Sequence, residues 1–127
     1  MISILDRIRN IEKDKLKGIT VDFGDGYTVT KIWHTSGAPY TERHKLNGKD
    51  HGPTFSWNKN ADLMAINNYM LGVITSTEKY ERKKIKERRE YDENGKLSQV
   101  EIWNSKGQLT KKDLYKDGKR VESLLSR

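Results

Sequence analysis

Large apolar side chains recur along this chain at an almost constant step. The intervals are 11 to 13 residues, and most contain a Gly or Asn shortly after the apolar position. Such a step with a turn signal inside it is typical of strand–turn–strand repeats. We therefore expect a ladder of antiparallel strands in which each unit adds one large side chain to a shared face. These positions, which we call the anchors, are Trp33, Leu46, Trp57, Tyr69, Tyr80, Tyr91, Trp103 and Tyr115.

Glycines mark where the chain should turn. In three units Gly follows the anchor after two or three residues, as in Leu46-Asn47-Gly48. In four others Gly or Ala follows after four residues, where a left-handed last turn position would require it. Because longer and shorter turns alternate, we expect them at opposite ends of a meander of about nine strands. The positions that close the longer turns are Gly37, Ala61, Gly95 and Gly107.

The composition suits a flat sheet better than a thick core. The chain has 127 residues, enough for one domain, but only 33% are hydrophobic while 34% are charged. Aromatic side chains bury much area each, so three Trp and six Tyr at regular spacing argue against disorder. The absence of cysteine excludes disulfides and thiolate chemistry.

The N-terminal segment has the pattern of an amphipathic helix. Over residues 3–16, Ile4, Leu5, Ile8 and Ile11 form one stripe, and Gly18 is a plausible stop. Repeat sheets need their ends covered, which favours a cap over a partner-binding or membrane-surface helix. The sequence thus divides into a capping helix, residues 1–18, and a β-repeat domain, residues 19–127.

Residues 76–90 interrupt the turn pattern, because they contain no Gly and the step from Tyr80 to Tyr91 lacks a turn signal. Their good helix formers favour a charged helix. The unbroken aromatic period favours two exposed strands joined by a polar turn, and we prefer this interpretation narrowly.

A basic run within that segment is the sharpest charged feature of a chain with net charge +7. On a strand, one face would carry four cations and the other two, edged by Tyr80 and Tyr91. A basic stripe with aromatic rings can follow a phosphate backbone, whereas a solvated edge strand is the plainer explanation. The candidate polyanion-binding residues are Arg82, Lys83, Lys84, Lys86, Arg88 and Arg89.

No catalytic or metal-binding pattern accompanies these features. The sequence has no phosphate-binding glycine loop and no HExxH pair, and the spacing of His34, His44 and His51 is not that of metal ligands. Three carboxylate pairs, Asp22 and Asp25, Asp92 and Glu93, and Asp113 and Asp117, flank turns, where such side chains bond their own backbone. We therefore expect a protein that is not an enzyme and needs no cofactor or metal.

Several segments resemble a known repeat family. Asn94-Gly-Lys-Leu97 before Trp103, Gly107-Gln-Leu109 before Tyr115, and Asp117-Gly-Lys119 are similar to the MORN-type repeats of bacterial YwqK-like antitoxin proteins. The stretch from Leu46 to Trp57 is similar to NGK…DGPA…W repeats of tailed-phage proteins. Ala61 and the segment 80–91 depart from the pattern. The resemblance implies a MORN-like β-repeat fold and a protein that acts by binding another.

The sequence therefore predicts a mainly β, non-catalytic binding protein that docks a protein partner, as an antitoxin or a phage-encoded inhibitor of a host defence protein would. Nucleic-acid binding through 82–89 is the alternative, and an acidic membrane surface is a weaker one. We expect a cytoplasmic location, no transmembrane segment, and open sheet edges that leave an edge-paired homodimer open. The candidate partner-binding residues are Tyr40, Phe55, Trp57, Met64 and Tyr69.

Overall fold

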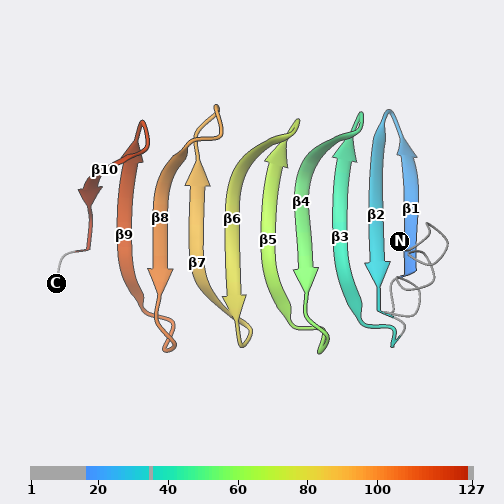
Figure 1. The fold of residues 1–127 in the computed structure, drawn as a ribbon, viewed down its shortest axis with the longest axis horizontal. Coiled ribbons are helices and arrows are strands. Elements are labelled where there is room, and N and C mark those ends of the chain that lie inside the picture. Colours follow the sequence, from blue (N-terminus) through green and yellow to red (C-terminus); the bar gives the residue numbers. More distant parts are fainter. Residues whose placement is uncertain (1–16, 35, 126–127) are drawn as a thin grey trace, which may run out of the picture.

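The fold is one antiparallel sheet in which every strand pairs with its neighbours in sequence (Figure 1). A computed structural model of the protein describes residues 17–34 and 36–125. The strands are β1 (Lys17–Gly24), β2 (Tyr27–Trp33), β3 (Pro39–Leu46), β4 (Lys49–Trp57), β5 (Leu63–Met70), β6 (Val73–Glu81), β7 (Lys84–Tyr91), β8 (Leu97–Trp103), β9 (Leu109–Lys116) and β10 (Lys119–Ser123).

The expected mainly β meander is confirmed, with ten strands where the sequence predicted about nine. The predicted capping helix, residues 3–16, lies outside the described residues. At the end of the predicted cap, β1 already begins at Lys17 and pairs Gly18 with Ile32, so Gly18 belongs to the sheet. The described residues contain no helix, and hence none that is long and apolar enough to span a membrane.

The segment 76–90 forms strands and a turn. β6 ends at Glu81, Arg82 and Lys83 form a two-residue turn, and β7 begins at Lys84. The preferred interpretation, strands joined by a polar turn, is therefore confirmed and the helical one is wrong. Helix propensity is overridden here because both strands pair along their length with neighbours on each side.

The predicted turn chemistry is confirmed at each long turn. The fourth residue after the anchor has positive φ in all four, from 63° at Ala61 to 90° at Gly37. In three of them the first turn residue is Asn or Asp and accepts two backbone N–H groups, as Asn58 Oδ1 does from Asn60 and Asp62 at 2.9 and 3.0 Å. Long and short turns lie at opposite ends of the sheet as far as β6, and the short β6–β7 turn breaks that alternation (Figure 1).

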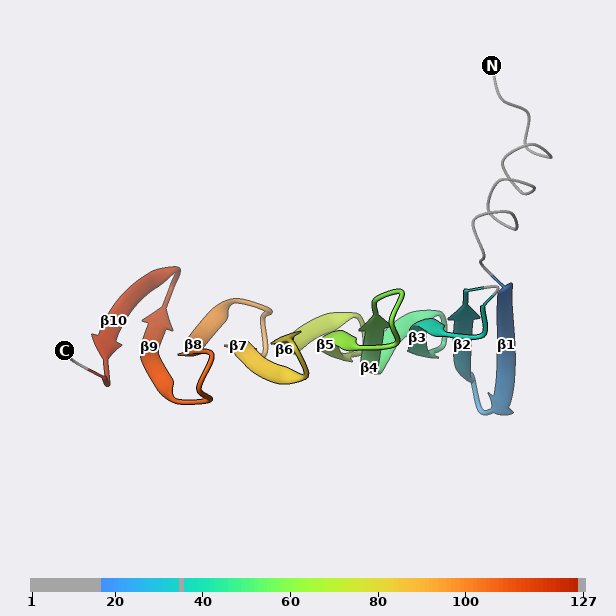
Figure 2. The same ribbon diagram turned by 90° about the horizontal axis from the view of Figure 1, so that it is seen from below.

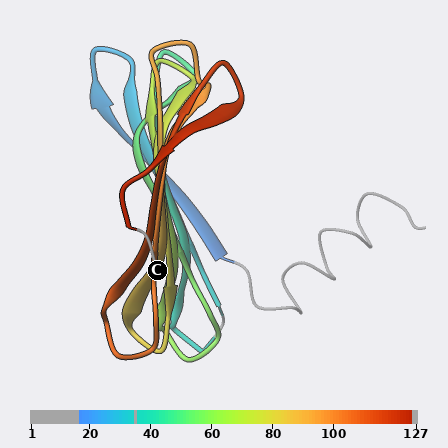
Figure 3. The ribbon, with the colours of Figure 1, turned by 90° about the vertical axis from the view of Figure 1, so that its left-hand side faces the viewer.

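The sheet is a single twisted layer with both faces open. Figures 2 and 3 show it edge-on and end-on, with no second layer of described residues against either face. Only Val29, Val100, His34 and Asp113 are buried among the described residues. A fold with so little interior is compatible with a chain that is one-third charged.

Strand pairing defines two faces of this sheet, because partners lie on the same side and neighbours along a strand on opposite sides. Face A carries a row that includes Arg43, Thr54, Asn67, Thr77 and Arg89. Face B carries a row that includes Glu42, Phe55, Ile66, Glu78, Arg88 and Glu101.

The anchors do not share one face, so that expectation was wrong. Each of the nine strand pairings contains a register shift, and in six of them the shift directly precedes an anchor, as at Ser56/Trp57. The anchors therefore mark β-bulges near strand ends, which increase the twist. Alternation along each strand, counted from the two rows given above, places the anchors Tyr69, Tyr91 and Tyr115 on face A and the other five anchors on face B. All eight anchors are half-buried.

Candidate functional site

Five rings form a continuous line on face B across the first four strands. We call Phe23, Tyr27, His44, Phe55 and Trp57 the aromatic band. Successive ring centroids are 6.0, 5.8, 6.5 and 5.8 Å apart, and Phe55 and Trp57 are stacked with planes 22° apart. Aromatic pairs at these separations attract each other beyond simple area burial. The band is therefore a preformed, rigid apolar surface.

His44 is the one polar ring of the band, and its orientation is fixed from both sides. Its Nδ1 is hydrogen-bonded to the Tyr27 hydroxyl, and its Nε2 lies 2.8 Å from a carboxylate oxygen of Glu42. Lys31 Nζ lies 3.5 Å from the other oxygen of Glu42. These contacts satisfy the polar atoms within the sheet, so His44 serves to join Tyr27 to Phe55.

The three histidines serve separate roles. His34 is buried with its ring edge-on to Tyr40 at 5.1 Å, and His51 Nδ1 accepts the backbone N–H of Leu71 at 3.1 Å. No group of three or more potential metal-ligating side chains occurs among the residues that the structure describes.

The band continues into an open sheet edge. β1 has a neighbour on one side only among the described strands. Its residues Ile19, Val21 and Phe23 are 57%, 44% and 66% exposed, and their pairing with β2 and the alternation along β1 place them on face B. An eight-residue edge with alternating apolar side chains presents both unpaired backbone groups and an apolar surface.

The structure brings two of the five predicted partner-binding residues together on face B. Phe55 and Trp57 belong to the aromatic band. Tyr40 and Met64, 40% and 42% exposed, are the extra residues at the register shifts of β3 and β5, so strand alternation does not assign them to a face. Trp57 also lines a hollow of about 200 Å3 with Trp33 and Pro39. Tyr69 lies on face A and is separated from Phe55 and Trp57 by the sheet itself.

Sequence reasoning missed Phe23, Tyr27 and His44, which belong to the band. The signal was present in the alternation Ile19, Val21, Phe23 before the Asp25-Gly26 turn. The spacing of the anchors does not reveal the strand register, and it is the register that brings these rings next to Phe55.

Face A around Tyr69 has a different character. Arg43 donates two hydrogen bonds to Asp50, at 2.6 and 2.9 Å, and both line a hollow of about 310 Å3 with Tyr69 and several threonines. The hydrogen bonds from the Arg43 guanidinium hold the pKa of Asp50 below its usual value. This polar, internally paired surface lacks the apolar continuity of face B.

The basic run is divided by the fold. Arg82 and Lys83 are turn residues, so the expected strand alternation does not extend to them. Arg88 lies on face B and Arg89 on face A. Lys86 is the extra residue at the register shift opposite Lys79 and Tyr80, and Lys84 pairs with Glu81, so the alternation from Arg88 does not extend to them.

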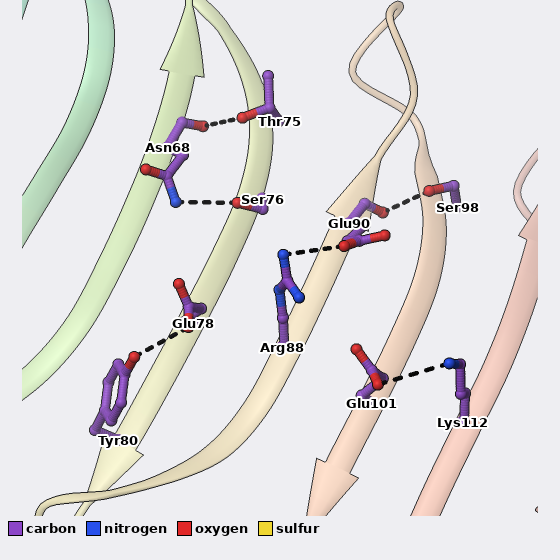
Figure 4. A network of polar contacts seen from close by, with 10 residues as sticks. All are labelled: Asn68, Thr75, Ser76, Glu78, Tyr80, Arg88, Glu90, Ser98, Glu101 and Lys112. Carbon is purple, nitrogen blue, oxygen red and sulfur yellow. Dashed lines mark hydrogen bonds and ion pairs between the residues drawn. The ribbon is translucent and has the colours of Figure 1, made fainter.

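Acidic neighbours lie beside three of the β7 cations in this run. Lys86 lies 2.6 Å from Glu81, Arg88 lies 3.1 Å from Glu90, and Arg89 lies 3.3 Å from Glu87. The pair of Arg88 and Glu90 belongs to a network of polar contacts over β5 to β9 (Figure 4). In it Tyr80 donates to Glu78 at 3.0 Å, and burial together with this acceptor raises the pKa of Tyr80.

Comparison with known proteins supports the fold. No family model and no curated protein matches the chain. It resembles the crystal structure of a mutant of S. aureus TarM in complex with fondaparinux, α-GlcNAc-glycerol and UDP, with a TM-score of 0.51 and 13% identity. A second TarM structure has a TM-score of 0.50 and 14% identity. Each match covers 97% of this chain but only 24% of TarM, so the likeness is one of fold alone.

Proposed function

We propose that this chain is a non-catalytic binding protein that docks a protein partner through the aromatic band and the adjoining β1 edge. The observation that carries the proposal is their continuity on one face, from Trp57 to the 66% exposed Phe23. Rigid aromatic side chains in a contiguous patch are typical of interface hot spots. The hollow beside Trp57 offers a place for one inserted partner side chain.

The β1 edge suits a partner that presents an extended segment. Unpaired N–H and C=O groups of an edge strand bind a further strand, while alternate side chains select its sequence. Ile19, Val21 and Phe23 would contact apolar side chains on face B of such an added strand. A partner strand with alternating apolar residues therefore fits this edge.

Protein binding is favoured over nucleic-acid binding along 82–89. A phosphate backbone needs a row of available cations. Here the cations are divided between two faces and a turn, and Lys86, Arg88 and Arg89 lie beside carboxylates. The aromatic band in turn has the acidic Glu42 at its border.

The resemblance to YwqK-like and phage repeat proteins supports a role as an antitoxin or an inhibitor of a host protein. In both roles the chain acts by occupying a surface of its partner, which requires no reacting group. The cysteine-free sequence is compatible with a reducing compartment, and the proposal places the complex in the cytoplasm.

The test removes the apolar edge without touching the sheet interior. The partner is captured from the native host at moderate salt after nuclease treatment, identified by mass spectrometry, and titrated against purified variants. Val21→Lys with Phe23→Lys should weaken binding at least tenfold. Met70→Lys with Val73→Lys, which adds the same charge at exposed apolar positions of β5 and β6, should leave binding unchanged.

Retained affinity in the β1 variant would refute docking at this edge. Capture that disappears with nuclease would favour the nucleic-acid alternative instead. A complex consisting only of this chain would show that a second copy occupies the edge, and light scattering would detect it.

A further inference from the structure

The β6–β7 turn differs in sequence from the other two-residue turns of the described sheet. In all five such turns both residues have positive φ, and in four of them the second residue is Gly. Those four are Asp25-Gly26, Asn47-Gly48, Leu71-Gly72 and Asp117-Gly118. The β6–β7 turn instead has Arg82 at φ 51° and Lys83 at φ 67°. Two long cationic side chains thus occupy positions that favour Asn and Gly.

Formation of the turn gives no reason for this choice. The left-handed conformation brings Cβ close to the following carbonyl oxygen in every residue except Gly. Asn47-Gly48 makes the same kind of turn in this chain without that conflict at its second position. Strained residues of this kind concentrate at sites where their side chains are used. The surroundings of Arg82, the turn residue that lines a hollow, therefore indicate what the turn is for.

A hollow of about 250 Å3 lies beside this turn, on the side of β8. Trp103 and Ile85 supply its apolar lining, and Arg82, Lys84 and Lys86 supply cations. Glu81, Asn104 and Ser105 complete the lining. An indole with several cations around it is the combination that binds a flat ring carrying an anionic group.

Two of the three cations remain available to a ligand. Lys86 is held by Glu81 at 2.6 Å, and this hydrogen bond keeps the pKa of the Glu81 carboxyl low. Lys84 donates to the backbone carbonyl of Ser105 at 3.3 Å, which keeps its charge and leaves its other donors free. Arg82 is exposed and makes no salt bridge within the described part of the chain.

The one side-chain amide of the lining is already occupied. The Asn104 side chain accepts the N–H groups of Lys106 and Gln108 and donates to Gln108 Oε1. Recognition here therefore depends on ring stacking and charge and makes little use of side-chain amides.

We propose that this hollow binds one nucleotide unit, with its base stacked on Trp103 and its phosphate held by Arg82 and Lys84. An anion without a ring would leave Trp103 and Ile85 uncovered, and an uncharged ring would not use the two cations. A free nucleotide and a nucleotide of a single strand present the same chemistry. The site lies over β6 to β8, apart from the aromatic band on β1 to β4, and does not depend on partner docking.

The test follows the indole N–H resonances of the full, 15N-labelled chain by NMR. Adenosine 5′-monophosphate should shift the Trp103 indole signal, assigned with Trp103→Phe, and leave those of Trp33 and Trp57 in place. Adenosine and ribose 5-phosphate, each lacking one half of the ligand, should bind at least tenfold more weakly. A 5′-phosphorylated tetra-adenylate in a parallel titration distinguishes a strand from a free nucleotide, since the tighter ligand identifies the source.

The decisive variant is Arg82→Asn with Lys83→Gly, which copies the Asn47-Gly48 turn. It should weaken binding at least tenfold while raising the midpoint of thermal unfolding, so that a loss of binding is not attributable to misfolding. Lys116→Gln with Lys119→Gln removes the same charge beside the β9–β10 turn and should leave binding unchanged. Unchanged binding in the Asn-Gly variant, equal loss in the control, or no Trp103 shift with either ligand would overturn the proposal.

Discussion

The stability of the β6–β7 turn provides a direct test of how this sheet is built. Arg82→Asn with Lys83→Gly replaces the one Gly-free two-residue turn among the described strands with the sequence found at residues 47–48. The change is confined to two exposed residues, and the flanking strands keep their pairing from Tyr80 to Ile85. The expected result is a more stable protein.

The magnitude follows from backbone conformation. A non-glycine residue in the left-handed region costs about 1–2 kcal/mol, which Lys83→Gly removes. The greater freedom of Gly in the unfolded chain takes back about 0.5–1 kcal/mol. Asn tolerates the left-handed region better than Arg, so Arg82→Asn adds roughly a few tenths of a kcal/mol to the free energy of unfolding. The lost contact is small, because Lys83 Nζ is 3.9 Å from Asp62 and its side chain is 81% exposed. The free energy of unfolding should rise by about 1 kcal/mol.

Urea unfolding followed by tryptophan fluorescence measures this difference, and a thermal scan should show a midpoint higher by roughly 4 °C. Gly48→Lys is the matched reverse change. A Cβ on Gly48 meets no atom within 4 Å, so its effect isolates backbone strain at φ 80°. It should lower stability by about 1 kcal/mol. If the Asn-Gly variant were no more stable than the natural chain while Gly48→Lys was destabilised, the strain assigned to the Arg82-Lys83 turn would be refuted.

Three further changes test other parts of the sheet. Ala61→Gly should raise the free energy of unfolding by about 0.5–1 kcal/mol in urea titrations, because Ala61 has φ 63° where the other long turns have Gly. Asp50→Asn should flatten the acid limb of the stability–pH curve. The pKa of Asp50 is lower in the folded protein than in the unfolded chain because of the hydrogen bonds from Arg43. The stabilisation that the Asp50 carboxylate contributes is therefore present above the unfolded pKa and is lost as the pH falls through the folded pKa. Phe55→Ala should lower stability by about 2 kcal/mol, less than a fully buried Phe would, and a Tyr27→Phe control should cost less than half of that.

The turns of this fold were predictable from sequence, and the faces were not. Gly and Asn report a local backbone requirement, so the positions of Gly37, Ala61, Gly95 and Gly107 located four turns before any pairing was known. The side on which an anchor projects depends on the parity of the whole strand and on each bulge. One extra residue reverses that parity, which is why Tyr69 was grouped with Trp57 and lies on the opposite face.

The candidate site, too, was predictable from sequence only in part. Trp57 was identified as a large, regularly spaced anchor, and Phe55 as a large side chain between two anchors. Phe23 and His44 were not, since only strand register brings them into line. The basic run was identified correctly as a charged feature, but its ion pairs to Glu81, Glu87 and Glu90 depend on cross-strand neighbours. The chemistry of a short segment can be recognised from its sequence. Which side chains meet across strands can be known only once the strand pairing is known.

The linear strand order has a consequence for how the molecule folds and unfolds. Each strand pairs only with the strands before and after it in sequence, so assembly needs no long loop closure and should be fast for a β protein. Local opening can begin at either end and advance hairpin by hairpin. Amide hydrogen exchange should therefore be slowest in β4 to β7 and fastest at β10, whose five residues are all exposed. A sheet with this nearest-neighbour dependence can also gain or lose a hairpin during evolution without a redesign of the strands that remain.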